Sequence, residues 1–288
     1  MLGLTNGLHY PNPPSGFSPL NYSDLIAWWD AGDIDTLWTD TSGTSTPSNG
    51  DDIARIDNKA YTLQGNTTNA LGAFLAQSTA SKCPHYISAR SSIAFTKSAG
   101  HYLVGNISTG PVDTSGSFNV FSESTVNLRA LTVFFVVDAA TASLSAANGI
   151  LHLKDANAYP SFEINGESAA NHWIYESTNL GGTAYVGNSG VDTTTNVELW
   201  TVRLNGTSSN AIYRNGDTSD GITNGESPNT DLVFDVNNVK YFVYLGQVTN
   251  AAGSFGGEFY EMLIYNRALG QSEYEEIETN LKAKHNIS

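Results

Sequence analysis

The chain has 288 residues, 40% of them hydrophobic, so it can bury a sizeable core and fits one large domain. Its formal net charge of −15, with 13 Lys and Arg against 28 Asp and Glu, argues against binding to nucleic acid or to an anionic membrane surface. The single cysteine excludes an internal disulfide.

Residues 1–22 differ from the rest of the chain because prolines and glycines block regular structure and favour an extended segment. Neither a signal peptide nor a membrane span is recognisable, so we expect a protein made in the cytoplasm. The segment is also more apolar than a solvated linker needs to be. We predict a docking arm, lying either on a partner or back on its own domain, whose contact residues are Leu2, Leu4, Leu8, Tyr10 and Phe17.

Residues 23–288 read as one domain of antiparallel strands, because short apolar or alternating runs are separated by clusters of Gly, Asn, Asp and Ser. The predicted strands are Leu25–Trp29, Ser92–Phe95, His101–Val104, Leu131–Val137, Gly149–Leu153, Ser161–Ile164, Trp173–Tyr175, Val197–Leu204, Ala211–Arg214, Tyr241–Leu245 and Glu258–Tyr265.

Two of these strands are predicted in more detail. Leu131–Val137 is apolar on both faces and should be a central strand of its sheet. In Val197–Leu204 apolar and polar side chains alternate, which predicts one buried face and one face toward water, the latter carrying Thr201 and Arg203.

A hairpin turn is predicted at Arg214–Asp217, because Asn215 and Gly216 accept the positive φ angles of a type I′ turn. We also expect the strands Trp200–Leu204 and Ala211–Arg214 to be neighbours in one sheet.

The end of the chain changes to a helical period and predicts a helix over residues 272–285. Ser272 and Glu275 match a capping box, in which the hydroxyl and the carboxylate each accept a backbone N–H at the start of the helix. Acidic residues crowd its first half and basic residues its end, as the helix dipole favours.

Four segments in this order resemble the concanavalin A-like lectin/glucanase superfamily, in its laminin-G-like branch. They are Leu25–Asp33 (LIAWWDAGD), Leu131–Val137 (LTVFFVV), the pair Trp200–Gly206 and Tyr213–Gly216, and Gly256–Leu269 (GGEFYEMLIYNRAL). The resemblance covers roughly residues 25–287. It implies an all-β fold, a two-sheet antiparallel jelly-roll sandwich with one C-terminal α-helix. Such domains occur on tailed-bacteriophage particles and in secreted sugar-binding modules.

The residues argue against catalysis. Retaining glycosidases need two carboxylates about 5 Å apart, typically on one strand face. Glu163 and Glu167 lack a central Asp between them, and the odd spacing of Glu258 and Glu261 predicts opposite faces. The histidines do not have zinc-ligand spacing, and no nucleophile elbow or phosphate-binding loop occurs.

Three groups remain as candidates for binding or for buried polar chemistry. Asp30, Asp33 and Asp35 follow a strand and are calcium candidates, with turn capping as the alternative. Most tryptophans are expected in the core, whereas Trp38 and Trp173 are expected as exposed platforms for a sugar ring. Glu261 is expected on the face of Phe259 and Leu263, with a partner in a neighbouring loop.

These observations together predict a non-enzymatic structural or recognition protein of a tailed-phage virion, a capsid decoration or a tail or fibre component. The arm would dock on other virion proteins, the sandwich would be exposed for surface adhesion, and the assembly would be a symmetric homo-oligomer, with a host-surface glycan as a further partner. Two alternatives stay open: a secreted carbohydrate-binding module and a glycosidase on the same fold.

Overall fold

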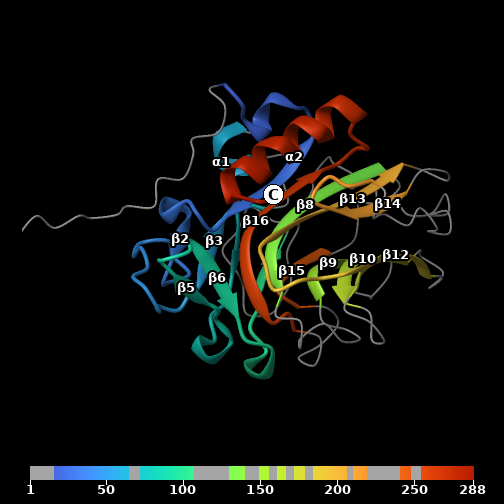
Figure 1. Ribbon diagram of the computed structural model, residues 1–288. Coiled ribbons are helices and arrows are strands. Elements are labelled where there is room, and N and C mark those ends of the chain that lie inside the picture. Colours follow the sequence, from blue (N-terminus) through green and yellow to red (C-terminus); the bar gives the residue numbers. More distant parts are fainter. Residues whose placement is uncertain are drawn as a thin grey trace, which may run out of the picture.

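The computed structural model is a sandwich of two antiparallel sheets, with one long helix on the outer face of the first sheet (Figure 1). It describes residues 16–64, 72–106, 130–139, 149–155, 161–166, 172–178, 184–205, 210–218, 241–247 and 254–288. The predicted fold class is confirmed. No helix in these ranges is long and apolar enough to cross a membrane.

The first sheet has seven strands, in the order β14-β13-β8-β16-β6-β5 with β1 paired to β16. Their bounds are β1 Leu25–Asp30, β5 His85–Ile87, β6 Ser92–Phe95, β8 Ala130–Ala139, β13 Glu198–Asn205, β14 Ala211–Arg214 and β16 Gly257–Tyr265.

The second sheet has nine strands, in the order β12-β11-β10-β9-β15-β7-β4-β3-β2. Their bounds are β2 Leu37–Trp38, β3 Arg55–Asp57, β4 Phe74–Ala76, β7 Leu103–Asn106, β9 Gly149–Asp155, β10 Ser161–Gly166, β11 His172–Thr178, β12 Ala184–Asp192 and β15 Tyr241–Leu245. The helices are α1 Lys59–Gln64 and α2 Gln271–His285, with 3-10 turns at Pro19–Asn21, Ile34–Thr36, Ala80–Lys82 and Lys97–Ala99.

Every predicted strand overlaps an observed one. The strands β2, β3, β4, β5 and β12 and the helix α1 were not predicted. Four of these strands have only two or three residues, which is too short for an alternating pattern to be recognised.

The core has two layers. The larger cluster lies between the sheets and includes Trp29, Phe135, Trp173 and Trp200. The smaller one lies between α2 and the outer face of the first sheet and includes Phe134 and Val136 of β8. Because β8 packs on both sides and pairs with both β13 and β16, its prediction as a central strand is confirmed.

The polar face of β13 does not point to water, so that prediction was wrong. Thr201 is fully buried, and its hydroxyl donates a hydrogen bond to Glu278 of α2 at 2.7 Å. Arg203 donates to the Leu269 carbonyl at 2.8 Å. Alternate side chains of β13 point to opposite sides of the sheet, and α2 covers the side that carries Thr201.

The start of α2 also differs from the prediction. The helix begins at Gln271 after Gly270, so Glu273, and not Glu275, reaches back to the N-cap. The Glu273 carboxylate accepts the Gly270 N–H at 2.8 Å and two guanidinium N–H bonds from Arg267 at 2.7 and 2.8 Å. These Arg267 bonds lower the pKa of Glu273 to about 2.

The predicted turn at Arg214–Asp217 is confirmed, because Asn215 and Gly216 have φ angles of 52° and 79° and the Asp217 N–H donates to the Arg214 carbonyl at 2.9 Å. The predicted pairing of β13 with β14 is confirmed as well, and the strand that would follow the turn lies outside the described residues. The Asn215 side chain also accepts the Leu199 N–H at 2.9 Å.

Asn215→Ala should therefore lower the free energy of unfolding by about 2 kcal/mol. Alanine disfavours the left-handed backbone of this position, and the hydrogen bond to the Leu199 N–H is lost. Asn215→Asp keeps both the acceptor and the tolerance of positive φ, and should cost less than half as much. Urea unfolding of both variants tests this, and equal losses would contradict the role given to the side chain.

Candidate functional site

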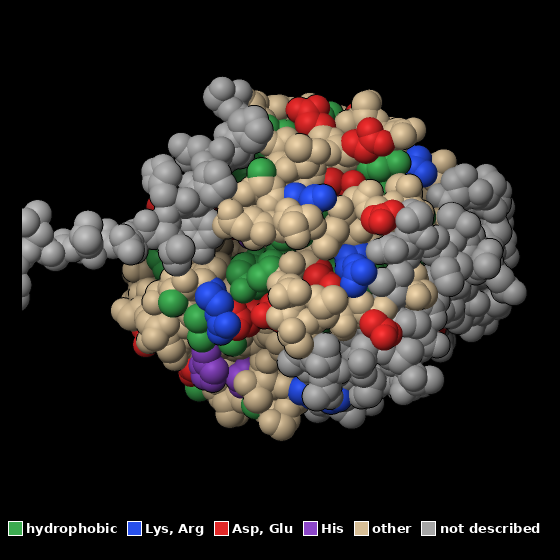
Figure 2. Space-filling model, viewed as in Figure 1, with side chains coloured by type: hydrophobic (Ala, Val, Ile, Leu, Met, Phe, Trp, Pro, Cys, Tyr) green, Lys and Arg blue, Asp and Glu red, His purple; other side chains and the backbone are tan. Residues whose placement is uncertain are grey.

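A pocket of about 350 Å³ lies where the end of α2 meets β1 and the segment before β1. Its apolar walls are Phe17, Pro19, Trp28 and Leu281, and charged residues from β1, β16, α1 and α2 complete it. On the face that carries α2, hydrophobic side chains are exposed in a hollow beside cationic and acidic ones (Figure 2). The volume is at the lower end of the range for small-molecule sites.

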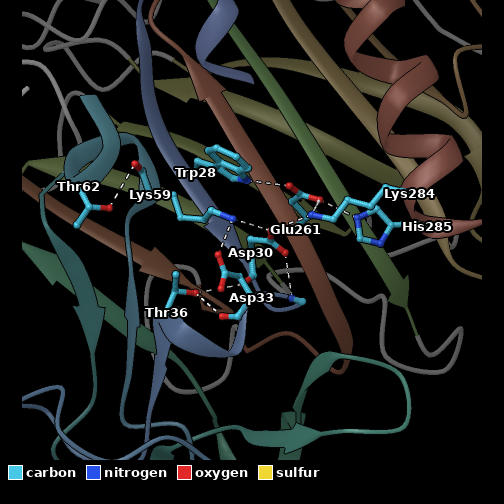
Figure 3. Close-up of polar contacts among 10 residues, drawn as sticks. Trp28, Asp30, Asp33, Thr36, Lys59, Thr62, Glu261, Lys284 and His285 are labelled. Atoms are coloured by element: carbon cyan, nitrogen blue, oxygen red, sulfur yellow. Dashed lines mark hydrogen bonds and ion pairs between the residues drawn. The ribbon is translucent and has the colours of Figure 1, made fainter. Parts of the chain in front are cut away.

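A buried ion network forms the floor of the pocket, and Glu261 is its centre (Figure 3). The Glu261 side chain is 2% exposed. It accepts hydrogen bonds from Trp28 Nε1 at 2.8 Å and Lys284 Nζ at 2.8 Å, and His285 Nε2 lies 2.7 Å from its Oε2. Its partners therefore come from β1 and α2, and the predicted partner in a neighbouring loop was wrong.

Asp30 lies directly opposite Glu261 in the β1–β16 pair, so two carboxylates face each other. Lys284 bridges them, because its Nζ also donates to Asp30 Oδ2 at 2.8 Å. Lys59 binds Asp30 at 3.1 Å and Asp33 at 2.7 Å, and lies 4.1 Å above the Trp28 ring. The two lysines offset the repulsion that like charges have at opposed strand positions.

Glu261 and Lys284 stay ionised at neutral pH. Burial by itself raises the pKa of Glu261, but the charges and hydrogen bonds of Lys284 and His285 outweigh it and hold that pKa well below the usual value. Burial likewise lowers the pKa of Lys284, and Glu261 and Asp30 outweigh it and raise that pKa above its usual value. Both groups are thus structural charges, and neither changes its protonation state near neutral pH, as a general acid or base would have to.

Glu258 and Glu261 both lie on the α2 side of the sheet, so the prediction of opposite faces was wrong. A bulge at Tyr260 shifts the pairing between β16 and β8, with Phe259 opposite Val137 but Glu261 opposite Val136. Glu258 accepts a hydrogen bond from Ser92 at 2.7 Å and forms an ion pair with Arg90. Each acid therefore has its own cation.

One polar atom beside the pocket has no hydrogen-bond partner among the described residues. Asn280 lines the pocket, is 5% exposed, and donates from Nδ2 to the Glu276 carbonyl at 2.7 Å. Its Oδ1 is buried and accepts no hydrogen bond from any described residue. Buried acceptors of this kind are rare, since each costs about 1–3 kcal/mol when left unpaired.

The described part of the predicted arm lies on its own domain. Phe17, Leu20 and Tyr22 pack against the cluster beneath α2. The Tyr265 hydroxyl donates to the Pro19 carbonyl at 2.8 Å, and the Tyr22 hydroxyl donates to Glu276 at 2.6 Å. The other predicted arm contacts, Leu2, Leu4, Leu8 and Tyr10, lie outside the described residues.

The two predicted sugar platforms have different surroundings. Trp173 is completely buried between the sheets, in contact with Phe135 and Phe255, so its prediction as an exposed platform was wrong. Trp38 is half-buried on the second sheet, and its Nε1 donates to Asp57 at 2.9 Å.

The three calcium candidates do not form a ligand set. Lys59 forms ion pairs with Asp30 and Asp33, and Asp35 is exposed in the 3-10 turn Ile34–Thr36. Within the described ranges, no group of three or more His, Cys, Asp or Glu side chains could hold a metal. Asp30 instead caps a turn by accepting the Gly32 N–H at 3.0 Å, which is the alternative that the sequence left open.

The outer face of the nine-stranded sheet carries a row of polar and aromatic side chains. Glu176, Glu163, His152 and Tyr244 lie opposite one another on the neighbouring strands β11, β10, β9 and β15. His152 Nε2 is 3.9 Å from Glu163 Oε2, and its ring centroid is 6.2 Å from that of Tyr244.

The same face continues to Trp38 at the other edge of the sheet. Arg55 is opposite Trp38, and Phe74 is opposite Asp57. The Arg55 guanidinium stacks 3.9 Å from the centre of the Phe74 ring and donates to Asp57 at 2.6 Å. At this edge of the sheet, aromatic rings and paired charges therefore lie side by side and hold one another in place.

Several solved structures are similar to the chain at low sequence identity. No family model and no curated protein matches the chain. The binding domain of Paraclostridial Mosquitocidal Protein 1 is 13% identical, with 88% of this chain and 52% of that chain covered and a TM-score of 0.49. The CBM40 domain of the Ruminococcus gnavus IT-sialidase is 17% identical, with 51% of this chain and 82% of that chain covered and a TM-score of 0.38. Mouse laminin alpha1 domains LG4-5 are 12% identical, with 52% of this chain and 39% of that chain covered and a TM-score of 0.38.

Proposed function

We propose that this protein is a non-enzymatic recognition protein that binds a saccharide on the outer face of its nine-stranded sheet. The observation that carries the proposal is the difference between the two outer faces. α2 and residues 16–22 cover the outer face of the first sheet, whereas Trp38, Phe74 and Tyr244 are each partly exposed among charged side chains on the outer face of the second sheet.

This surface suits the chemistry of sugars. A sugar ring has apolar C–H faces that pack on aromatic rings, and hydroxyls that both donate and accept hydrogen bonds. Trp38 supplies a ring, and Asp57 and Arg55 beside it supply an acceptor and a donor that are already held in place by each other. Such fixed side chains lose little conformational freedom on binding.

A glycan array followed by titration of the best ligand tests the proposal. Trp38→Ala should weaken that binding at least roughly tenfold, as the loss of a stacked aromatic anchor does. Leu63→Ala removes an exposed apolar side chain from α1, which packs against β1 of the other sheet, and should leave the affinity unchanged. Binding that is absent, or that survives Trp38→Ala intact in a folded variant, would contradict the proposal.

A glycosidase is the second candidate, because Glu163 and Glu176 are directly opposed on neighbouring strands. Directly opposed side chains have Cβ atoms about 5 Å apart, so their carboxyl groups can approach the separation of about 5 Å between carboxyl groups that a retaining mechanism uses. Incubation with oligosaccharides should release no reducing ends if the protein only binds. Release that disappears in both Glu163→Gln and Glu176→Gln would replace the binding proposal with this one.

We further propose that the recognition protein belongs to a tailed-phage virion, as a capsid decoration or a tail or fibre component, with a host-surface glycan as its target. The acidic charge, which favours solubility at high local concentration, and the apolar, proline-rich segment ahead of the domain favour this setting. Antibody labelling of purified particles tests it, and label confined to the unassembled fraction would contradict it.

A further inference from the structure

We infer that the pocket beside α2 receives Tyr10 from the arm of a second copy of this chain, so that copies are joined by their arms. This inference is independent of saccharide binding, because the pocket and the proposed sugar surface lie on different sheets.

The pocket suits a side chain that is both apolar and able to donate a hydrogen bond. Its walls Phe17, Pro19, Trp28 and Leu281 favour an apolar or aromatic group. The buried Oδ1 of Asn280, without a partner among the described residues, favours a hydroxyl or amide donor close to that group. The charged groups of the floor, Glu261 and Lys284, already have each other as partners and do not need a charged occupant.

The arm offers such a side chain at one position. Among residues 1–15, Tyr10 alone combines an aromatic ring with a hydroxyl, and Leu2, Leu4 and Leu8 have no donor. The arm also enters the described structure at the pocket, because Gly16 is followed directly by Phe17 and Ser18 of its wall.

The sequence of the arm predicts that Tyr10 does not reach the pocket of its own copy. Pro11, Pro13 and Pro14 fix their own φ angles and favour extended backbone in the residues before them. Extended backbone rises about 3.1 Å per residue, so these prolines predict a separation of roughly 20 Å between Tyr10 and Phe17. That is too far for the pocket that Phe17 lines, whereas a neighbouring copy brings its pocket to Tyr10.

Photo-cross-linking tests which copy supplies the residue. The full chain is prepared with p-benzoylphenylalanine at position 10, and unlabelled and 15N-labelled proteins are mixed before illumination. We expect cross-linked peptides of mixed isotope that join position 10 to peptides containing Trp28 or Leu281. Cross-links within one chain only, or none that reach the pocket, would overturn the inference.

Variants of the arm test the chemistry without disturbing the domain. By sedimentation, Tyr10→Ala should raise the dissociation constant at least roughly tenfold and Tyr10→Phe roughly fivefold. His9→Ala should change it little, since successive side chains of an extended chain point to opposite sides. In the Asn280→Leu background Tyr10→Phe should have no further effect. A monomeric wild type, or equal effects of Tyr10→Ala and His9→Ala, would overturn the inference.

Discussion

Replacing Lys284 with Met should lower the free energy of unfolding by about 3–5 kcal/mol, as breaking a buried ion pair on one side does. The side chains of Glu261 and Asp30 are 2% and 5% exposed, and Lys284 is the cation that contacts both. After the substitution, the opposed carboxylates keep Lys59 and His285 as their basic partners, on separate sides. The measurement is urea unfolding followed by tryptophan fluorescence near pH 7.

A matched control lies two residues earlier on the same helix. Lys282 donates one hydrogen bond to the Asn215 carbonyl at 3.0 Å, so Lys282→Met should cost about 1 kcal/mol. The double variant Lys284→Met with Glu261→Leu should be more stable than Lys284→Met alone, because one of the two opposed buried carboxylates is then removed. If both Lys→Met variants lose equally little, the network does not hold α2 to the sheet.

Much of the fold could be predicted because strand periodicity is a local property of the sequence. The runs that became β8, β13 and β16 have the apolar patterns that their places in the sheet require. The same patterns do not reveal what covers a strand. Thr201 has the position of a solvent-facing residue and is buried by α2, whose contact with β13 joins residues far apart in the chain.

The pocket and its network were not predicted, for a related reason. Lys284 was assigned only to the helix dipole, but its contacts are 23 residues away at Glu261 and 254 residues away at Asp30. The bulge at Tyr260 reverses the faces expected from alternation, and no residue in that run marks it. The expectation that Glu261 needs a partner was the one signal, because a carboxylate in an apolar strand is costly alone.

Glu278 should make the stability of this protein fall as pH rises through the weakly acidic range. The residue is 4% exposed beneath α2, and burial raises the pKa of its carboxyl to about 7, although the hydrogen bond from Thr201 and the charge of Lys282 act to lower it. In the unfolded chain the usual pKa applies, so the folded state binds the proton more tightly. Ionisation therefore destabilises the folded state from about pH 4.5 upward.

Glu278→Gln should remove this dependence, because the amide is neutral at every pH and resembles the protonated carboxyl. Its free energy of unfolding should equal that of the wild type near pH 4.5 and exceed it by about 3 kcal/mol at pH 8, from about 1.4 kcal/mol per pKa unit. Glu275→Gln changes an exposed glutamate of the same helix and should show no such trend. Urea unfolding between pH 4.5 and 8 measures both. A gain that is constant with pH would mean that Glu278 is already ionised in the folded protein, with Lys282 as its counter-charge.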